Sequence, residues 1–161
     1  YGDHRDLHYP LRRQRQMCIR DRFDGIIKDS LQNIRDTGVF TASLVDHDLA
    51  VAMNDSSATL GPDVDEFEKT GLTAANFGQV DAPGVEEAKA VVECEAIREV
   101  EFGDKDGLHH VITFGEVIAF HIDSQVLDGT RIDPVRLDAL GRLAGMDYTT
   151  TRDQFRLDRP D

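Results

Sequence analysis

Two neighbouring segments with strand-like periodicity constrain the fold of this chain more than any other feature. From residue 88 to residue 102 the sequence alternates with a period of two. One set of alternate positions is apolar and consists of Ala90, Val92, Cys94, Ala96, Val100 and Phe102; the other set carries Glu93, Glu95, Glu99 and Glu101. This period is typical of a strand with one buried and one solvent-facing side. We therefore expect a long, half-exposed antiparallel strand.

A turn and a second strand follow directly. Residues 103–107 begin and end with glycine and contain Asp104, Lys105 and Asp106, a composition typical of a turn. Residues 110–123 are then apolar on both alternating faces. A strand that is apolar on both faces lies deep in a sheet, so the second strand should be the more buried of the two.

Short helices are predicted around these strands. Asp29 or Ser30 can cap a helix over residues 29–37, which ends at Gly38, where a left-handed conformation costs little. Further short helices are expected over residues 49–54 and 64–71, and the Asp133-Pro134 pair predicts another over residues 134–140. Residues 39–45 favour a strand, and residues 148–157 an irregular or weakly extended tail.

Strands interleaved with short capped helices predict an α+β domain built around a small barrel, not a doubly wound sheet. No G-x-G-x-x-G or Walker sequence is present. A nucleotide or flavin would therefore need another device, such as a helix N-terminus that faces a phosphate. Lys28, Asp29 and Ser30 are the candidates, because a cation, a hydroxyl and first-turn N–H groups meet there. The alternative is an ordinary capped helix beside a solvated lysine.

Charge and hydropathy narrow the range of partners. The net charge of −13 disfavours nucleic acid and anionic membrane surfaces. No apolar run approaches the roughly 18 residues of a membrane span, and the first 30 residues lack a secretory apolar segment. Cys18 and Cys94 are too few for a disulfide framework. We expect a cytoplasmic protein.

The first 22 residues differ from the rest of the chain. They carry a net charge of +3, which leaves −16 for the remaining 139 residues, and they show no helical or strand periodicity. Residues 14–22 resemble a translated sequencing-adapter remnant. We therefore expect residues 1–22 to be a non-native or disordered basic segment and residues 23–161 to be the domain. The alternative is a genuine basic tail that binds an acidic partner.

Residues 23–161 resemble the FMN-binding split-barrel flavin reductase family. The first match is the K-D-[ST]-x-x-N-I-x-x-T-G run at residues 28–38. The later matches, in family order, are Ala52-Met53-Asn54 with Ser56-Ser57, Asp65-Glu66-Phe67-Glu68 with Gly71-Leu72-Thr73, Glu93-Cys94, Gly115-Glu116-Val117 with His121, and Gly141-Arg142-Leu143 ahead of Tyr148. Each match is weak alone, but their order is specific.

The resemblance implies a split β-barrel of Greek-key type that forms a homodimer and binds FMN at the dimer interface. It also implies hydride transfer from NAD(P)H to flavin, with a monooxygenase as a further partner. Carried over residue by residue, Lys28 and Ser30 would hold the FMN phosphate, and Asp29 and Asn33 would support the local turn. No catalytic acid or base is required, because the cofactor supplies the chemistry.

Three more residues are cofactor-binding candidates. His121 shares a small-residue face with Gly115 and Ala119 where a flavin or nicotinamide ring could approach; the alternative is a core histidine. Arg142 and Tyr148 match positions that related domains turn toward the flavin, although a surface arginine and a packing tyrosine explain them equally. No metal site is expected, since His109 and His110 point to opposite faces of a strand.

The chain departs from the family pattern before Phe23. The Pro-Arg-Pro type segment, the Thr/Ser near the flavin ring and the Asn-x-Ala-Pro-x-Ser turn are not found there. The resemblance therefore predicts a partial barrel that lacks its first strands, with an exposed sheet edge. Two alternatives to the reductase remain open: a non-catalytic FMN-binding module, and an inactive fragment of the enzyme.

Overall fold

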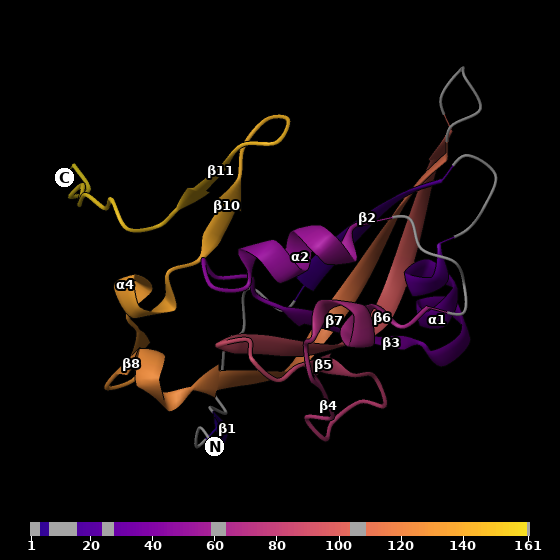
Figure 1. Cartoon of the computed structure of the whole chain (residues 1–161), viewed down its shortest axis with the longest axis horizontal. Coiled ribbons are helices and arrows are strands. Elements are labelled where there is room, and N and C mark those ends of the chain that lie inside the picture. The colour runs from indigo at the N-terminus through magenta and orange to yellow at the C-terminus, as the bar shows by residue number, and fades with distance from the viewer. Residues whose placement is uncertain (1–3, 7–15, 24–27, 59–63, 104–108, 161) are drawn as a thin grey trace.

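A computed structural model of the 161-residue chain describes residues 4–6, 16–23, 28–58, 64–103 and 109–160 (Figure 1). The helices are α1 (Asp29–Thr37), α2 (Ala50–Ser56), α3 (Glu66–Thr70) and α4 (Pro134–Leu137), with a 3-10 turn η1 (Ser124–Val126). The strands are β1 (His4–Asp6), β2 (Gln16–Phe23), β3 (Val39–Ser43), β4 (Ala74–Ala75), β5 (Gly84–Val85), β6 (Ala90–Gly103), β7 (His109–Asp123), β8 (Leu127–Asp128), β9 (Arg131–Ile132), β10 (Leu140–Arg142) and β11 (Tyr148–Thr150). The mixed α+β prediction is confirmed.

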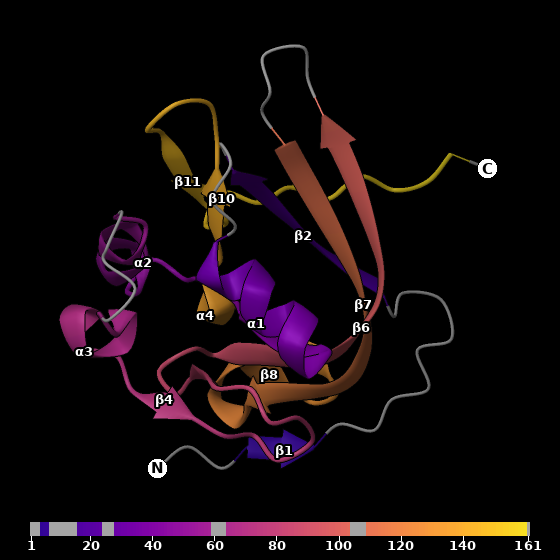
Figure 2. The ribbon, with the colours of Figure 1, turned by 90° about the vertical axis from the view of Figure 1, so that its right-hand side faces the viewer.

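The long antiparallel hairpin of β6 and β7 is the centre of the fold, as predicted (Figures 1 and 2). The main sheet has five strands in the order β1-β7-β6-β3, and β2 also pairs with β7. Three two-stranded sheets, β4–β5, β8–β9 and β10–β11, surround it. The hydrogen-bonded ladders among the described strands do not close into a barrel.

Two irregularities interrupt the hairpin ladder, and they correct the predicted faces. The register shifts between Glu93 and Cys94 and again between Ala96 and Arg98. A β-bulge moves the following residues to the other face of the strand. Glu99 and Glu101 therefore turn toward α1, where both accept hydrogen bonds from Arg35. The sequence alternation placed them opposite the core residues of β6.

The face beneath α1 forms a buried core. Ile34 of α1 packs with Phe40, Cys94 and Val117, and Cys94 has no exposed surface. Gly115 allows this packing, because a Cβ atom at that position would overlap the Phe40 ring, with Cε1 only 2.7 Å away. The core thus fixes α1 on one face of the hairpin (Figure 2).

The predicted helices are present, with corrections at their ends. Gly38 ends α1 with a φ of 74°, as expected, but the N-cap is Lys28, and both Asp29 and Ser30 are helical. The helix predicted over residues 134–140 ends at Leu137, because Asp138 adopts a left-handed φ of 51° and Leu140 enters β10. Among the described residues, no helix has the length and hydropathy needed to span a membrane.

The N-terminal segment contributes backbone to the sheet. β2 pairs with β7 from Gln16 opposite Glu116 to Phe23 opposite His109, and β1 pairs with the other end of β7. The sequence shows no strand periodicity here, so the expectation that this segment lacks regular structure was wrong for these two strands. The native or foreign origin of residues 1–22 stays a prediction.

Candidate functional site

The N-terminal end of α1 presents the predicted phosphate-binding residues to solvent. Lys28 is the N-cap, with an extended backbone (φ −70°, ψ 147°), and Asp29 and Ser30 form the start of the first turn. All three are exposed, whereas Leu31 is buried against the domain. A helix N-terminus carries a partial positive charge and first-turn N–H groups that favour an anion. The end of α1 therefore combines these groups with a lysine and a hydroxyl.

Asp29 and Asn33 lie at different positions relative to the N-terminal end of α1. Asn33 lies one turn after Ser30 on the same side of the helix and is exposed. Its carbonyl accepts a 2.7 Å hydrogen bond from the Thr37 hydroxyl, within the helix. Asp29 is an exposed acidic residue in the first turn. Its carboxylate suits the helix dipole but would repel a phosphate that came into direct contact with it.

His121 lies elsewhere, in a second buried cluster on the opposite face of the hairpin. Its Nε2 atom is 2.5 Å from Oε2 of Glu93, and both side chains are buried. The Phe77 ring tilts against the imidazole, with 4.9 Å between ring centroids. Burial, a carboxylate partner and a ring contact are what a core histidine requires. These contacts favour the core interpretation of His121, and its role in cofactor binding stays a prediction.

Glu93 organises this cluster, although the sequence alternation placed it on the solvent-facing side. Its other oxygen, Oε1, accepts hydrogen bonds from the backbone N–H groups of Gln79 and Val80, each 3.0 Å long. Glu93 is fully buried, and the backbone of Gln79 and Val80 lies against its carboxylate. The only sign of this role in the sequence is that Glu93 is an acidic residue within an apolar strand. The period-two alternation of that strand accounts for Glu93 equally well.

Arg142 and Tyr148 are neighbours on the β10–β11 hairpin. They are directly opposite in the antiparallel register, and the Arg142 guanidinium carbon lies 5.9 Å from the centroid of the Tyr148 ring. This is a cation–π geometry at an exposed position. In Figure 1 the β10–β11 hairpin stands well apart from α1. The structure therefore pairs these two candidates with each other and not with Lys28.

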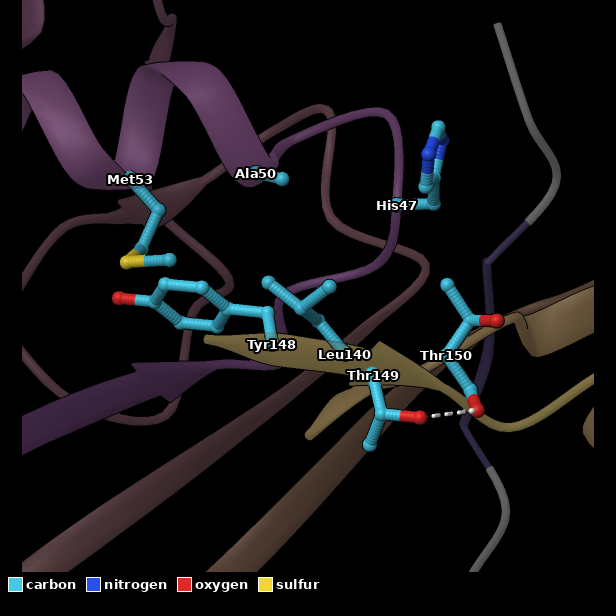
Figure 3. Close-up of a pocket in the computed structure, with 7 residues that line it drawn as sticks. All are labelled: His47, Ala50, Met53, Leu140, Tyr148, Thr149 and Thr150. Carbon is cyan, nitrogen blue, oxygen red and sulfur yellow. Dashed lines mark hydrogen bonds between the residues drawn. The ribbon is translucent and has the colours of Figure 1, made fainter. Parts of the chain in front are cut away.

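Tyr148 also lines a hollow between α2 and the β10–β11 hairpin (Figure 3). The hollow has a volume of about 430 Å³, within the usual range for small-ligand sites. Its lining residues are His47, Ala50, Met53, Leu140, Tyr148, Thr149 and Thr150. Met53 and Tyr148 lie together at one end, and His47 and Thr150 lie at the other. Met53 and Tyr148 belong to family-like matches in the sequence, but no motif grouped them with the other lining residues.

Backbone contacts hold the two sides of the hollow together. The Leu140 N–H donates to the Val45 carbonyl over 2.9 Å, and Asp46 forms an isolated bridge with Ala139. The buried Asp46 carboxylate also accepts from the Leu49 N–H and from Lys89, at 3.0 and 2.7 Å. The hydrogen bond to Asp46 raises the pKa of Lys89. These contacts join the segment just before α2 to Lys89, which precedes β6, and to the start of β10.

Similarity to known proteins agrees with this arrangement of elements. Residues 17–137 match the model of the flavin reductase like domain. An uncharacterized protein of Deinococcus radiodurans is 38% identical over 143 residues, which cover 86% of this chain and 61% of that protein. The chain thus spans less than two thirds of that relative's length.

Two solved structures show the likeness of fold. Nitrilotriacetate monooxygenase component B from Bacillus cereus superposes with a TM-score of 0.82 at 29% identity, covering 88% of this chain and 71% of that one. An FMN-binding domain of a flavin reductase-like enzyme from Shewanella baltica superposes with a TM-score of 0.61 at 19% identity, covering 88% and 74%. The match over most of the chain shows that this protein belongs to the flavin reductase-like domain family.

Proposed function

We propose that this domain binds FMN and acts as an NAD(P)H:flavin oxidoreductase. The phosphate of FMN would bind at the N-terminal end of α1. The observation that carries the proposal is that the family-like run at residues 28–38 folds as a helix that begins at an exposed lysine. Membership of the flavin reductase-like family supports a flavin as the ligand. We also propose that the domain adopts the split-barrel arrangement that the family resemblance implies.

The residues at this end fit a phosphate. α1 has nine residues, long enough for a helix dipole, and its buried Leu31 and Ile34 fix its direction. Lys28 supplies a full positive charge, and Ser30 supplies a hydroxyl that can donate to a phosphate oxygen. These groups lie within three consecutive residues, so one terminal phosphate can reach all of them.

Each residue of this end has a distinct role in the proposal. Lys28 neutralises the anion, and Ser30 and the first-turn N–H groups orient it. Asn33, one turn further, supports the turn, and Asp29 balances the helix dipole without contacting the phosphate. When bound, FMN would accept hydride at its ring, and the protein would position that ring and exclude water around it.

The flavin ring of FMN would need contacts with residues other than those at the N-terminal end of α1. His121 is buried against Glu93, while Arg142 and Tyr148 lie beside the hollow on another part of the chain. A homodimer would allow residues from two copies to contribute to one flavin site, as the family resemblance implies. We therefore propose a homodimer in which Arg142 and Tyr148 serve the flavin bound by the partner copy.

The recipient of the reduced flavin is proposed to be a second protein. The similarity to component B of nitrilotriacetate monooxygenase supports this, because that protein's name places it in a multicomponent oxygenase. A monooxygenase component would use reduced FMN that the reductase releases. The aromatic and aliphatic lining of the hollow is also consistent with a planar ligand.

Two measurements on the same protein test the proposal. Equilibrium dialysis measures retained FMN, and the loss of NADH or NADPH absorbance with added FMN measures hydride transfer. Retained FMN with faster nicotinamide oxidation is the expected result. Retained FMN without oxidation would contradict the reductase and favour a binding module, and failure to retain FMN would contradict both.

A further inference from the structure

The hollow between α2 and the β10–β11 hairpin contains hydrogen-bonding groups that the chain itself does not use. The hydroxyl groups of Tyr148 and Thr150 have no hydrogen-bond partner within the part of the chain that the structure describes. The Nδ1 atom of His47 lies 3.7 Å from Oδ1 of Asp48, which is too far for a hydrogen bond. A ligand in the hollow could therefore use all three side chains without breaking a contact.

The lining is apolar in the middle and polar at one end (Figure 3). Ala50 of α2 and Leu140 of β10 lie between the two ends. At one end the Met53 thioether lies over the Tyr148 ring, and thioethers and aromatic rings both pack well against a flat aromatic ring. At the other end are the His47 imidazole and Thr150. This arrangement fits one flat ring with a hydrogen-bonding substituent directed toward His47 and Thr150.

The aromatic end of the hollow is held in place before any ligand binds. Tyr148 is opposite Arg142 in the β10–β11 register, and the guanidinium carbon of Arg142 is 5.9 Å from the centre of the Tyr148 ring. The Leu140 N–H donates to the Val45 carbonyl, which ties β10 to the segment before α2. A ligand therefore pays little to order these walls.

The charges around the polar end favour an uncharged substituent. The carboxylates of Asp46 and Asp138 are paired with Lys89 and Arg152, at 2.7 and 2.6 Å. Asp48, beside His47, forms no ion pair with a lysine or arginine among the described residues. A ligand carboxylate at this end would be repelled by Asp48, because like charges brought together disfavour binding. A carboxamide would keep the hydrogen bonds without the repulsion.

We propose that the hollow is a binding site for an uncharged aromatic carboxamide. Its ring would lie among Met53, Tyr148 and Leu140, and its amide would bond to Thr150 and His47. This inference goes beyond the proposed function, which assigns no ligand to the hollow. Two sources share this chemistry: the nicotinamide group of a nicotinamide nucleotide, and a free aromatic amide.

An NMR titration of the ¹⁵N-labelled, flavin-free full chain with benzamide at pH 8 tests the proposal. Benzamide should shift the backbone amide signals of Ala50, Thr149 and Thr150. Benzoate, which differs in its charge, and cyclohexanecarboxamide, which lacks the flat ring, should each bind at least about fivefold more weakly. Displacement of benzamide by NADH would identify the nicotinamide nucleotide as the source, and no displacement would identify a free aromatic amide.

Two substitutions test the site in different ways. Ala50→Leu fills the hollow and should raise the benzamide dissociation constant at least about tenfold. Thr150→Val keeps the shape but removes the hydroxyl group, and should raise it about fivefold, the scale of one hydrogen bond. Val51→Leu is the matched control, because Val51 is the next residue of α2 and is 73% exposed.

Four results would each overturn the proposal: no shift at Ala50 and Thr150, benzoate binding as tightly as benzamide, a dissociation constant that neither Ala50→Leu nor Thr150→Val changes, or equal weakening by Val51→Leu. All of these measurements use flavin-free protein. Failure of the proposed FMN site would therefore appear in the separate FMN measurements and not here.

Discussion

The Glu93 carboxylate and the His121 imidazole meet in the interior of the domain, with 2.5 Å between Oε2 and Nε2. Glu93 lies on β6 and His121 on β7. The two are not directly opposite, because His121 is paired with Val91, two residues before Glu93. The second carboxylate oxygen of Glu93 binds the backbone of Gln79 and Val80. One acidic side chain therefore joins the hairpin to the segment that covers it.

Glu93→Gln should reduce stability. The substitution keeps the shape but removes the charge, and one end of the amide then presents N–H groups where Glu93 accepts hydrogen bonds. We expect a loss of about 1–3 kcal/mol in the free energy of unfolding, measured by urea denaturation. Glu95→Gln, two residues away and exposed, should change it by no more than about 0.5 kcal/mol. Equal effects of the two substitutions would show that the buried contacts have little energetic weight.

Gly115→Ala should destabilise the core beneath α1. The added methyl group would overlap the Phe40 ring and lie 3.1 Å from the Cβ atom of Cys94. We expect a cost of about 1–3 kcal/mol from overpacking, seen as a lower midpoint of thermal unfolding. Combining it with Phe40→Leu should cost less than the sum of the two single changes. Strict additivity would contradict the contact between Gly115 and Phe40.

Cys94 should be unreactive in the folded protein. Burial, and to a smaller extent the nearby Glu93 charge, raise the pKa of its thiol from 9.0 to about 11. In a Cys18→Ser background, alkylation by iodoacetamide at pH 8 should therefore be slow until denaturant is added. Because the fold favours the neutral thiol, its contribution to stability is complete below pH 9.0 and is lost as the pH rises toward 11. Rapid alkylation of the native protein would contradict this burial.

Much of the fold follows from local sequence. The alternation in β6, the apolar character of β7 and the stop of α1 at Gly38 all correspond to structure, because strand periodicity and a left-handed helix end depend on neighbouring residues only. The two bulges in the hairpin depend on how two strands meet. Their effect on Glu99 and Glu101, which turn toward Arg35, could not be read from alternation.

The candidate site was predictable to the same extent. The residues at the N-terminal end of α1 form a contiguous run, so the sequence could group them together as a candidate phosphate site. The surroundings of His121 depend on Glu93, Phe77 and a covering segment from other parts of the chain. The pairing of Arg142 with Tyr148 likewise requires the β10–β11 register, which no periodicity indicated.

The central claim is that the N-terminal end of α1 binds the phosphate of FMN, and comparing FMN with riboflavin tests it most directly. Riboflavin lacks the phosphate, so the ratio of the two dissociation constants isolates that group. The account predicts that calorimetric titration shows tighter binding of FMN. Lys28→Gln and Ser30→Ala should each lower the preference about tenfold, the usual scale of a lost charge-assisted hydrogen bond. Lys69→Gln, on the exposed part of α3, is the matched control. A preference for FMN that both Lys28→Gln and Ser30→Ala leave unchanged would contradict the account.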